Sequence, residues 1–167
     1  MEKFKTILID KFGEEAILGA DLNAIPNALL VKPEFLKKIC QELTEHKECY
    51  FDSLSSITGI DNGPELNTME VVYNLYSIPL EKHLMLKVVL GRAKPEVSSL
   101  SEIWKTANWH ERETYDLLGI VFTNHPDLRR LLMPADWEGH PLRKDYTEPE
   151  RYRGMKTKRE EENNDKL

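Results

Sequence analysis

The 167-residue chain lacks the segments and thiol groups that mark several large classes of protein. Its longest runs without a charged residue are ten residues long, whereas a membrane-spanning helix needs about 20. Asp10 interrupts the stretch where a signal peptide would be apolar, so we expect neither a transmembrane segment nor a secretory signal. The two cysteines, Cys40 and Cys49, cannot supply the four thiolates of an iron–sulfur cluster. We interpret both as reduced core thiols rather than as a disulfide.

Motifs of catalysis and nucleotide binding are equally scarce. The eight glycines never form Gly-x-Gly, no Gly-Lys-Ser or Gly-Lys-Thr occurs, and no serine stands in a Gly-x-Ser-x-Gly elbow. His110 lacks the second histidine four residues later that a zinc-binding helix requires. His125 and His140 each precede a proline, which is typical of a hydrogen-bonded corner. We therefore expect no catalytic, cofactor-binding or metal-binding residue in this chain.

The charge balance argues against nucleic acid as a partner. Twenty-three basic and 29 acidic residues give a net charge of −6, the wrong sign for a protein that holds a phosphate backbone. Forty per cent of the residues are apolar, enough for the core of one domain.

Residues 1–97 carry the patterns of an α/β core domain. An amphipathic helix ends at Gly13, and a second helix begins at Pro33 with a buried stripe of Leu36, Ile39, Cys40 and Leu43. Short apolar or alternating runs predict strands over residues 16–18, 28–31, 50–60, 68–77 and 82–90. This pattern predicts an α+β fold, with a mixed or mainly antiparallel sheet and helices packed on one side.

Residues 98–146 have a different sequence pattern from residues 1–97, and we expect them to complete the same domain. Ser99 and Glu102 form a capping box that predicts a helix from Ser99 toward Gly119. A strand over 120–123 and one helical turn through Leu132 follow. From Met133 to Tyr146 no periodicity remains, and the Trp, Leu and Tyr content favours an ordered, irregular, partner-binding segment.

A charged C-terminal tail, residues 147–167, ends the predicted organisation. Of the 25 residues from 143 onward, fifteen are charged. Such a segment buries too little apolar surface to order itself, so it is either flexible or laid onto another protein.

Glu111 falls on the apolar stripe of the predicted helix. Because a buried carboxylate needs a partner, we expect an arginine from later in the chain, with Arg129, Arg130 and Arg143 as candidates. Arg112 and Asp116 are four residues apart and should pair on the helix surface. The cluster around Glu111 suits either acid–base chemistry or a structural ion-pair network, and the absence of a neighbouring nucleophile favours the network.

Three stretches of sequence resemble one known family. They are residues 111–120 (ERETYDLLGI), 125–132 (HPDLRRLL) and 136–146 (DWEGHPLRKDY), preceded by Ile103-Trp104 and Ala107-Asn108-Trp109. Together they resemble the signature of the C subunit of bacterial NADH–quinone oxidoreductase, respiratory complex I, which has mitochondrial and chloroplast counterparts. Residues 1–97 match that family only in length and texture.

The resemblance implies a cofactor-free subunit of the peripheral arm of a proton-pumping enzyme. FMN and iron–sulfur clusters in other subunits would carry electrons from NADH to quinone. The implied partners are chiefly the D subunit, with the B and I subunits nearby, and the implied location is the cytoplasmic side of the cell membrane, with membrane contact only through the complex. The signature residues implied to hold or present the docking surface are Glu111, Arg112, Glu113, Asp116, His125, Arg129, Arg130, Gly139, His140, Pro141, Arg143, Lys144, Asp145 and Tyr146.

Two alternatives remain open at this point. Relatives of this subunit also occur in membrane-bound nickel–iron hydrogenases and other complex I-like dehydrogenases. A more distant interpretation is a free cytosolic enzyme that uses Glu111 and Glu113 as acid and base.

Overall fold

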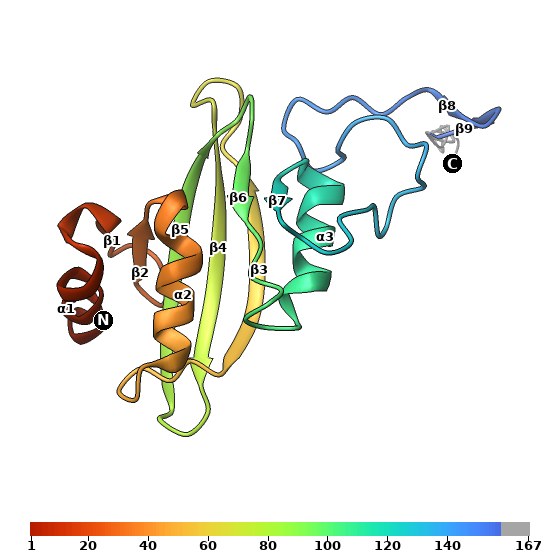
Figure 1. Ribbon diagram of the computed structural model, residues 1–167. Helices are drawn as coiled ribbons and strands as arrows, with labels where there is room; N and C mark the ends of the chain where they lie inside the picture. Colours follow the sequence, from red (N-terminus) through yellow and green to blue (C-terminus); the bar gives the residue numbers. More distant parts are fainter. Residues whose placement is uncertain (158–167) are drawn as a thin grey trace, which may run out of the picture.

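The computed structural model describes residues 1–157 and is built on one five-stranded sheet (Figure 1). The strand order is β1-β2-β5-β4-β3. Only the β2–β5 pair is parallel; the other neighbours are antiparallel. The strands are β1 (Ile17–Asp21), β2 (Ala28–Val31), β3 (Ser53–Asp61), β4 (Thr68–Ser77) and β5 (Lys82–Gly91). The predicted α+β class and mixed sheet are confirmed.

The core lies on one face of this sheet because each long strand alternates. In β5, Leu84, Leu86, Val88 and Leu90 are buried, as the sequence predicts. After a 3₁₀ turn over Pro33–Phe35, helix α2 (Leu36–Glu45) lays its predicted stripe on this face. Helix α1 (Glu2–Phe12) ends at Gly13 and flanks β1. Both cysteines are buried and free, as predicted.

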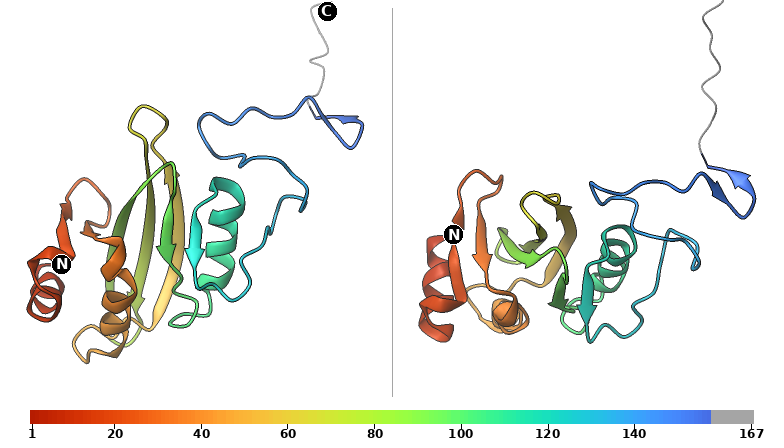
Figure 2. Two further views of the ribbon diagram at one scale, coloured as in Figure 1. Left: turned by 45° about the horizontal axis from the view of Figure 1, so that its top comes forward. Right: turned by 90° about the horizontal axis from the view of Figure 1, so that it is seen from above.

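Gly59 lets the third helix, α3 (Ala107–Leu118), approach strand β3 closely. A Cβ at Gly59 would lie 2.5 Å from Leu118 Cδ1 and 2.7 Å from Thr114 Cγ2. Gly59 faces the same side of the sheet as Ile57, a core residue, because side chains alternate along a strand. Helices α2 and α3 therefore cover the same face, in agreement with the predicted one-sided arrangement (Figures 1 and 2).

The predicted helix from Ser99 is wrong in its first half. Residues 99–106 form turns and irregular chain, and α3 begins only at Ala107. The Ser99 hydroxyl does not cap a helix but donates a hydrogen bond to the Glu111 carboxylate. Leu100 and Trp104 nevertheless fill the core from these turns. The helical turn expected before Leu132 is also absent among the described residues, because the backbone there binds Asp116 instead.

Beyond α3 the chain runs across the molecule with little regular structure. Strand β7 (Val121–Thr123) pairs in parallel with β6 (Glu96–Ser98), close to the predicted strand. A long irregular path then leads to a hairpin of β8 (Arg151–Tyr152) and β9 (Met155–Lys156), which lies away from the main sheet in every view (Figure 2). Of the expected tail, residues 158–167 lie outside the described residues. No helix within residues 1–157 is long and apolar enough to cross a membrane.

Candidate functional site

The irregular segment, defined here as residues 124–146, contains most of the signature residues. It is fixed to the sheet and to α3 by two buried acidic side chains, Asp61 and Asp116, whose exposed fractions are 5% and 0%. Each carboxylate accepts hydrogen bonds from chain that has no helix or strand of its own. The backbone of this segment therefore obtains from side chains the partners that a regular element would supply.

Asp116 fixes the first half of the irregular segment to α3. Its Oδ2 accepts the backbone N–H groups of Leu131, Leu132 and Met133 at 2.7–2.9 Å. Its Oδ1 accepts Arg130 Nη1 at 2.8 Å. Burial acts to raise the pKa of Asp116, but the Met133 N–H, the Arg130 guanidinium and the other N–H donors outweigh burial and lower it. The predicted surface pair of Arg112 with Asp116 is wrong, because Asp116 points inward to Arg130.

Arg130 and His140 extend this connection along the segment. Arg130 Nη2 donates to the carbonyl oxygens of Trp137 and Gly139, both at 2.9 Å. His140 Nδ1 lies 2.9 Å from the Asp116 carbonyl oxygen. Burial lowers the pKa of His140. The hydrogen bond to the Asp116 carbonyl opposes burial, whereas the guanidinium groups of Arg143 and Arg130 act with burial to lower this pKa.

Asp61, at the end of β3, fixes the second half of the segment. It accepts Arg92 Nε at 2.7 Å and Nη2 at 3.1 Å, a bidentate pair, and the backbone N–H of Lys144 at 2.8 Å. Arg92 also contacts the Asp145 carboxylate. The Arg92 guanidinium holds the pKa of Asp61 well below its ordinary range.

Glu111 is buried as predicted, but its predicted arginine partner is wrong. Its Oε2 accepts the Ser99 hydroxyl at 2.6 Å and its Oε1 accepts the Leu100 N–H at 2.7 Å. His125 Nε2 lies 3.9 Å from Oε2. Since His125 Nδ1 accepts a hydrogen bond from the Asp127 N–H, the ring proton is on Nε2, which donates a hydrogen bond to the Asn108 carbonyl. Glu111 therefore has neutral partners in place of a cation.

Burial raises the pKa of Glu111 to about 7 from an ordinary value of 4.5, against the two donated hydrogen bonds. The folded state thus binds a proton more tightly than the unfolded chain, and this group destabilises the fold progressively as pH rises from about 4.5 to 7. Relative to Glu111→Gln, we expect the wild-type free energy of unfolding to fall by up to about 3 kcal/mol across that range and to level off above it. Chemical denaturation at a series of pH values measures this, and parallel curves for the two proteins would contradict it.

The other signature residues lie on α3 or in the irregular segment, next to the contacts of Asp61, Glu111 and Asp116. Arg112 stacks over Trp109, 5.2 Å from the ring centre, and donates to the Arg129 carbonyl at 3.4 Å. The Arg129 side chain pairs with Asp127 on the surface. Further along, Arg143 Nε donates to the Leu118 carbonyl at 2.7 Å, and Lys144 Nζ lies 3.5 Å from the Asn62 carbonyl.

Gly139 and Gly119 lie where neighbouring side chains leave no room for a Cβ atom. A Cβ at Gly139 would lie 3.0 Å from the Tyr146 ring, whose hydroxyl accepts the Trp137 indole N–H at 2.9 Å.

Pro141, which follows His140, is half-buried. Glu113 is exposed, on the far side of α3 from Glu111, so the two do not form an acid–base pair.

Gly119 ends α3 in the left-handed conformation (φ 75°), and a Cβ there would lie 2.6 Å from the His140 ring and 2.8 Å from Arg143 Nη2. We expect Gly119→Ala to destabilise the protein by about 2 kcal/mol, from backbone strain and displacement of these side chains. The matched control is Gly154→Ala, with φ 85° but no heavy atom of the described chain within 4 Å of its Cβ. Thermal unfolding compares them; equal losses would show that packing around Gly119 contributes nothing.

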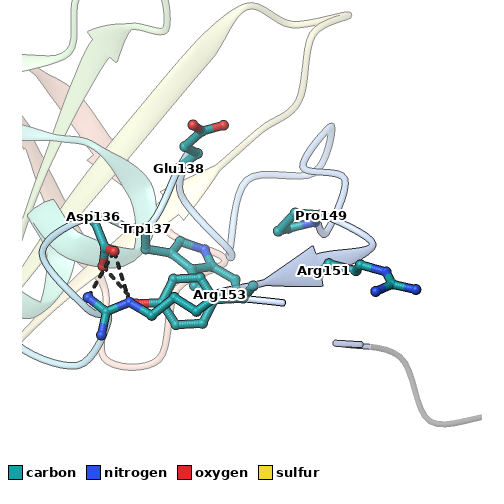
Figure 3. A pocket seen from close by; sticks show the side chains of 7 residues that line it. Asp136, Trp137, Glu138, Pro149, Arg151 and Arg153 are labelled. Carbon is teal, nitrogen blue, oxygen red and sulfur yellow. Dashed lines mark hydrogen bonds and ion pairs between the residues drawn. The ribbon is translucent and has the colours of Figure 1, made fainter. Parts of the chain in front are cut away.

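The middle of the irregular segment is joined to the β8–β9 hairpin. Asp136 accepts the Tyr152 hydroxyl at 2.7 Å and pairs with Arg153, while the Trp137 and Tyr152 ring centres lie 5.0 Å apart. These residues line a surface pocket, from which the Arg151 side chain extends away (Figure 3). The hairpin is therefore positioned by Asp136 and Trp137.

Sequence reasoning missed Asp61, Arg92 and Asp136. Asp61 begins the Asp-Asn-Gly-Pro turn, and its role in that turn, accepting the Gly63 N–H at 3.0 Å, concealed its second role toward Lys144. Arg92 had no signal beyond its place after a strand. Within residues 1–157 no group of three or more His, Cys, Asp or Glu side chains is placed to hold a metal ion.

Comparison with known proteins assigns the family. Residues 29–152 match the family described as "Respiratory-chain NADH dehydrogenase, 30 Kd subunit". The chain belongs to this family. A relative from Chloroherpeton thalassium, named as the C subunit of NADH-quinone oxidoreductase, is 40% identical over 152 residues, which are 90% of this chain and 62% of the relative. The chain thus spans about three fifths of that relative's length.

Two solved structures share the fold of this chain. A fragment of Nqo5 (residues 1–134 of that protein) is 32% identical and superposes with a TM-score of 0.52, covering 61% of this chain and 82% of the fragment. A chain from an archaeal membrane-bound sulfane sulfur reductase complex superposes with a TM-score of 0.69 over 87% of this chain and 85% of its own. At 21% identity, that second likeness concerns the fold alone.

Proposed function

We propose that this chain is a cofactor-free subunit of the peripheral arm of a proton-pumping NADH–quinone oxidoreductase. In this role FMN and iron–sulfur clusters in other subunits carry electrons from NADH to quinone, and this chain holds the quinone-reducing module together. Its partners are chiefly the D subunit, with the B and I subunits nearby, and it reaches the cytoplasmic side of the cell membrane only through the complex. Family membership supports the proposal.

The observation that carries it is an irregular segment that is rigidly fixed and yet presents apolar side chains to solvent. Asp61 and Asp116 bind its backbone, while its Leu132 and Leu142 are 60% exposed, and Trp109 of the neighbouring α3 is 61% exposed. Anchored, exposed Trp and Leu side chains beside arginines are typical of a protein–protein interface. A free enzyme would instead require a nucleophile or an acid–base pair near Glu111.

A tagged copy purified from native membranes in mild detergent tests this function. We expect flavin- and iron–sulfur-containing subunits to co-elute with NADH–quinone reductase activity. Asp116→Ala, which removes the acceptor that holds the irregular segment on α3, should lower the amount of assembled complex, with the turnover per assembled complex retained. Co-elution with a nickel–iron protein would favour the hydrogenase alternative, and elution of the chain alone would contradict both.

A further inference from the structure

Strand β3 is an edge strand of the main sheet, and within residues 1–157 it pairs with β4 alone. It is the last strand in the order, and its nine residues contain no proline, lysine or arginine. The opposite edge strand, β1, has five residues, a register shift between Ile17 and Gly19, and helix α1 alongside it (Figure 1). Proteins protect exposed edges with such devices, because a free edge is a template for another strand.

The hydrogen-bond register identifies the free backbone groups. Asn62 donates its N–H to the Thr68 carbonyl, so Asn62 and Thr68 form a hydrogen-bonded pair. In an antiparallel ladder every second pair is of this kind, so Thr58 and Val72 also exchange hydrogen bonds between β3 and β4. The residues between such pairs, Ile57 and Gly59, consequently direct their N–H and C=O groups away from β4. Earlier in the chain, Trp104 and Thr106 donate to the carbonyls of Phe51 and Leu54, so the open part of the edge begins near Ser56.

A groove runs along this open edge between β3 and α3. Four consecutive strand residues, 56–59, line it, although only alternate side chains of a strand share a face; the groove therefore reaches the strand's backbone edge. Its opposite wall includes Leu117, Leu118 and Leu142. Leu142 is 60% exposed, yet its backbone N–H is held by the Leu117 carbonyl at 3.0 Å.

We propose that this groove binds an extended segment of a partner subunit, which adds to the sheet as a sixth strand next to β3. About five or six residues of the partner segment suffice to span the open part of the β3 edge, because a strand rises about 3.3 Å per residue. Backbone groups of Ile57 and Gly59 supply the pairing, and the leucines receive alternate apolar side chains. This inference rests on the proposed function, in which the chain works inside a multi-subunit complex.

Charge identifies the kind of segment. Glu113 lines the groove and has no ion-pair partner within residues 1–157, so the segment carries a lysine or arginine opposite it. A second copy of this chain would bring its own Glu113 to the groove instead of a cation. The chain's own residues 158–167 (KREEENNDKL) offer a single apolar residue, too few to fill the apolar wall.

Hydrogen exchange of the full chain, alone and within the purified complex, tests the pairing. We expect the amides of Ile57 and Gly59 to exchange at least about ten-fold more slowly in the complex, the ratio that about 1.4 kcal/mol of added protection gives. Unchanged exchange of both amides in an intact complex would overturn the inference while leaving the proposed function standing. Absence of the complex itself would instead remove the proposed function.

A substitution and a cross-link identify the occupant. Leu142→Asp should reduce retention of the chain in the complex about ten-fold, whereas Leu66→Asp, at a 69% exposed leucine in the β3–β4 loop, should not. A benzophenone amino acid in place of Leu142 should cross-link to an extended, lysine- or arginine-containing segment of a partner subunit. Cross-links to residues 158–167 or to a second copy, or equal retention of the two leucine variants, would overturn the inference.

Discussion

Replacing Asp116 with alanine should lower the free energy of unfolding by about 3–5 kcal/mol, the largest loss that we expect from one substitution. The change would leave the Arg130 guanidinium without its carboxylate and the N–H groups of Leu131, Leu132 and Met133 without an acceptor. The irregular segment should then detach from α3. Urea denaturation measures the energy, and limited proteolysis between residues 128 and 146 measures the detachment.

Glu113→Ala is the matched control for this substitution. Glu113 lies on the same helix and also loses a carboxylate, but it is exposed and has no ion-pair partner within residues 1–157. We expect its free energy of unfolding and its proteolysis pattern to match those of the wild type when the chain is studied alone. If Asp116→Ala behaved in the same way, the segment would be held by something other than this carboxylate.

The second large effect concerns Asp61. Asp61→Ala should destabilise the chain by about 3 kcal/mol, because it removes the bidentate partner of Arg92 and the acceptor of the Lys144 N–H together. Asp145→Ala removes the other carboxylate at Arg92, but the Asp145 side chain is 51% exposed, and the Lys144 N–H is accepted by Asp61. Its effect should be much smaller, and thermal unfolding of the two variants compares them. Similar losses would mean that Arg92, rather than the carboxylate at Asp61, organises this region.

The main sheet could be predicted from sequence because local pattern and global fold agree there. The predicted strand over 68–77 matches β4, and 82–90 matches β5 apart from its last residue. Alternation of apolar and polar residues along these strands identified the face that is buried. Helix α2 likewise presents its predicted stripe.

The site was less predictable because its polar groups form long-range contacts. Burial of Glu111 followed from its place on an apolar stripe, but nothing local indicated that Ser99 would bind it rather than cap a helix. The same contact explains why the helix begins late. Asp116 pairs with Arg130, fourteen residues away, which also donates to the Trp137 and Gly139 carbonyls. Arg112 stacks over Trp109 instead and donates to the Arg129 carbonyl. Spacing along a helix does not reveal such choices.

The contact between Asp61 and Lys144 joins residues 83 positions apart in the chain. Closing so long a loop is entropically costly, so this contact should form only after the sheet and α3 are in place, on the native side of the folding barrier. Loss of the Asp61 carboxylate should therefore accelerate unfolding and leave the refolding rate nearly unchanged. Stopped-flow measurements in urea would show a shift of the unfolding limb alone. The part of the irregular segment around Lys144, which attaches last during folding, would then slow the unfolding of the native state.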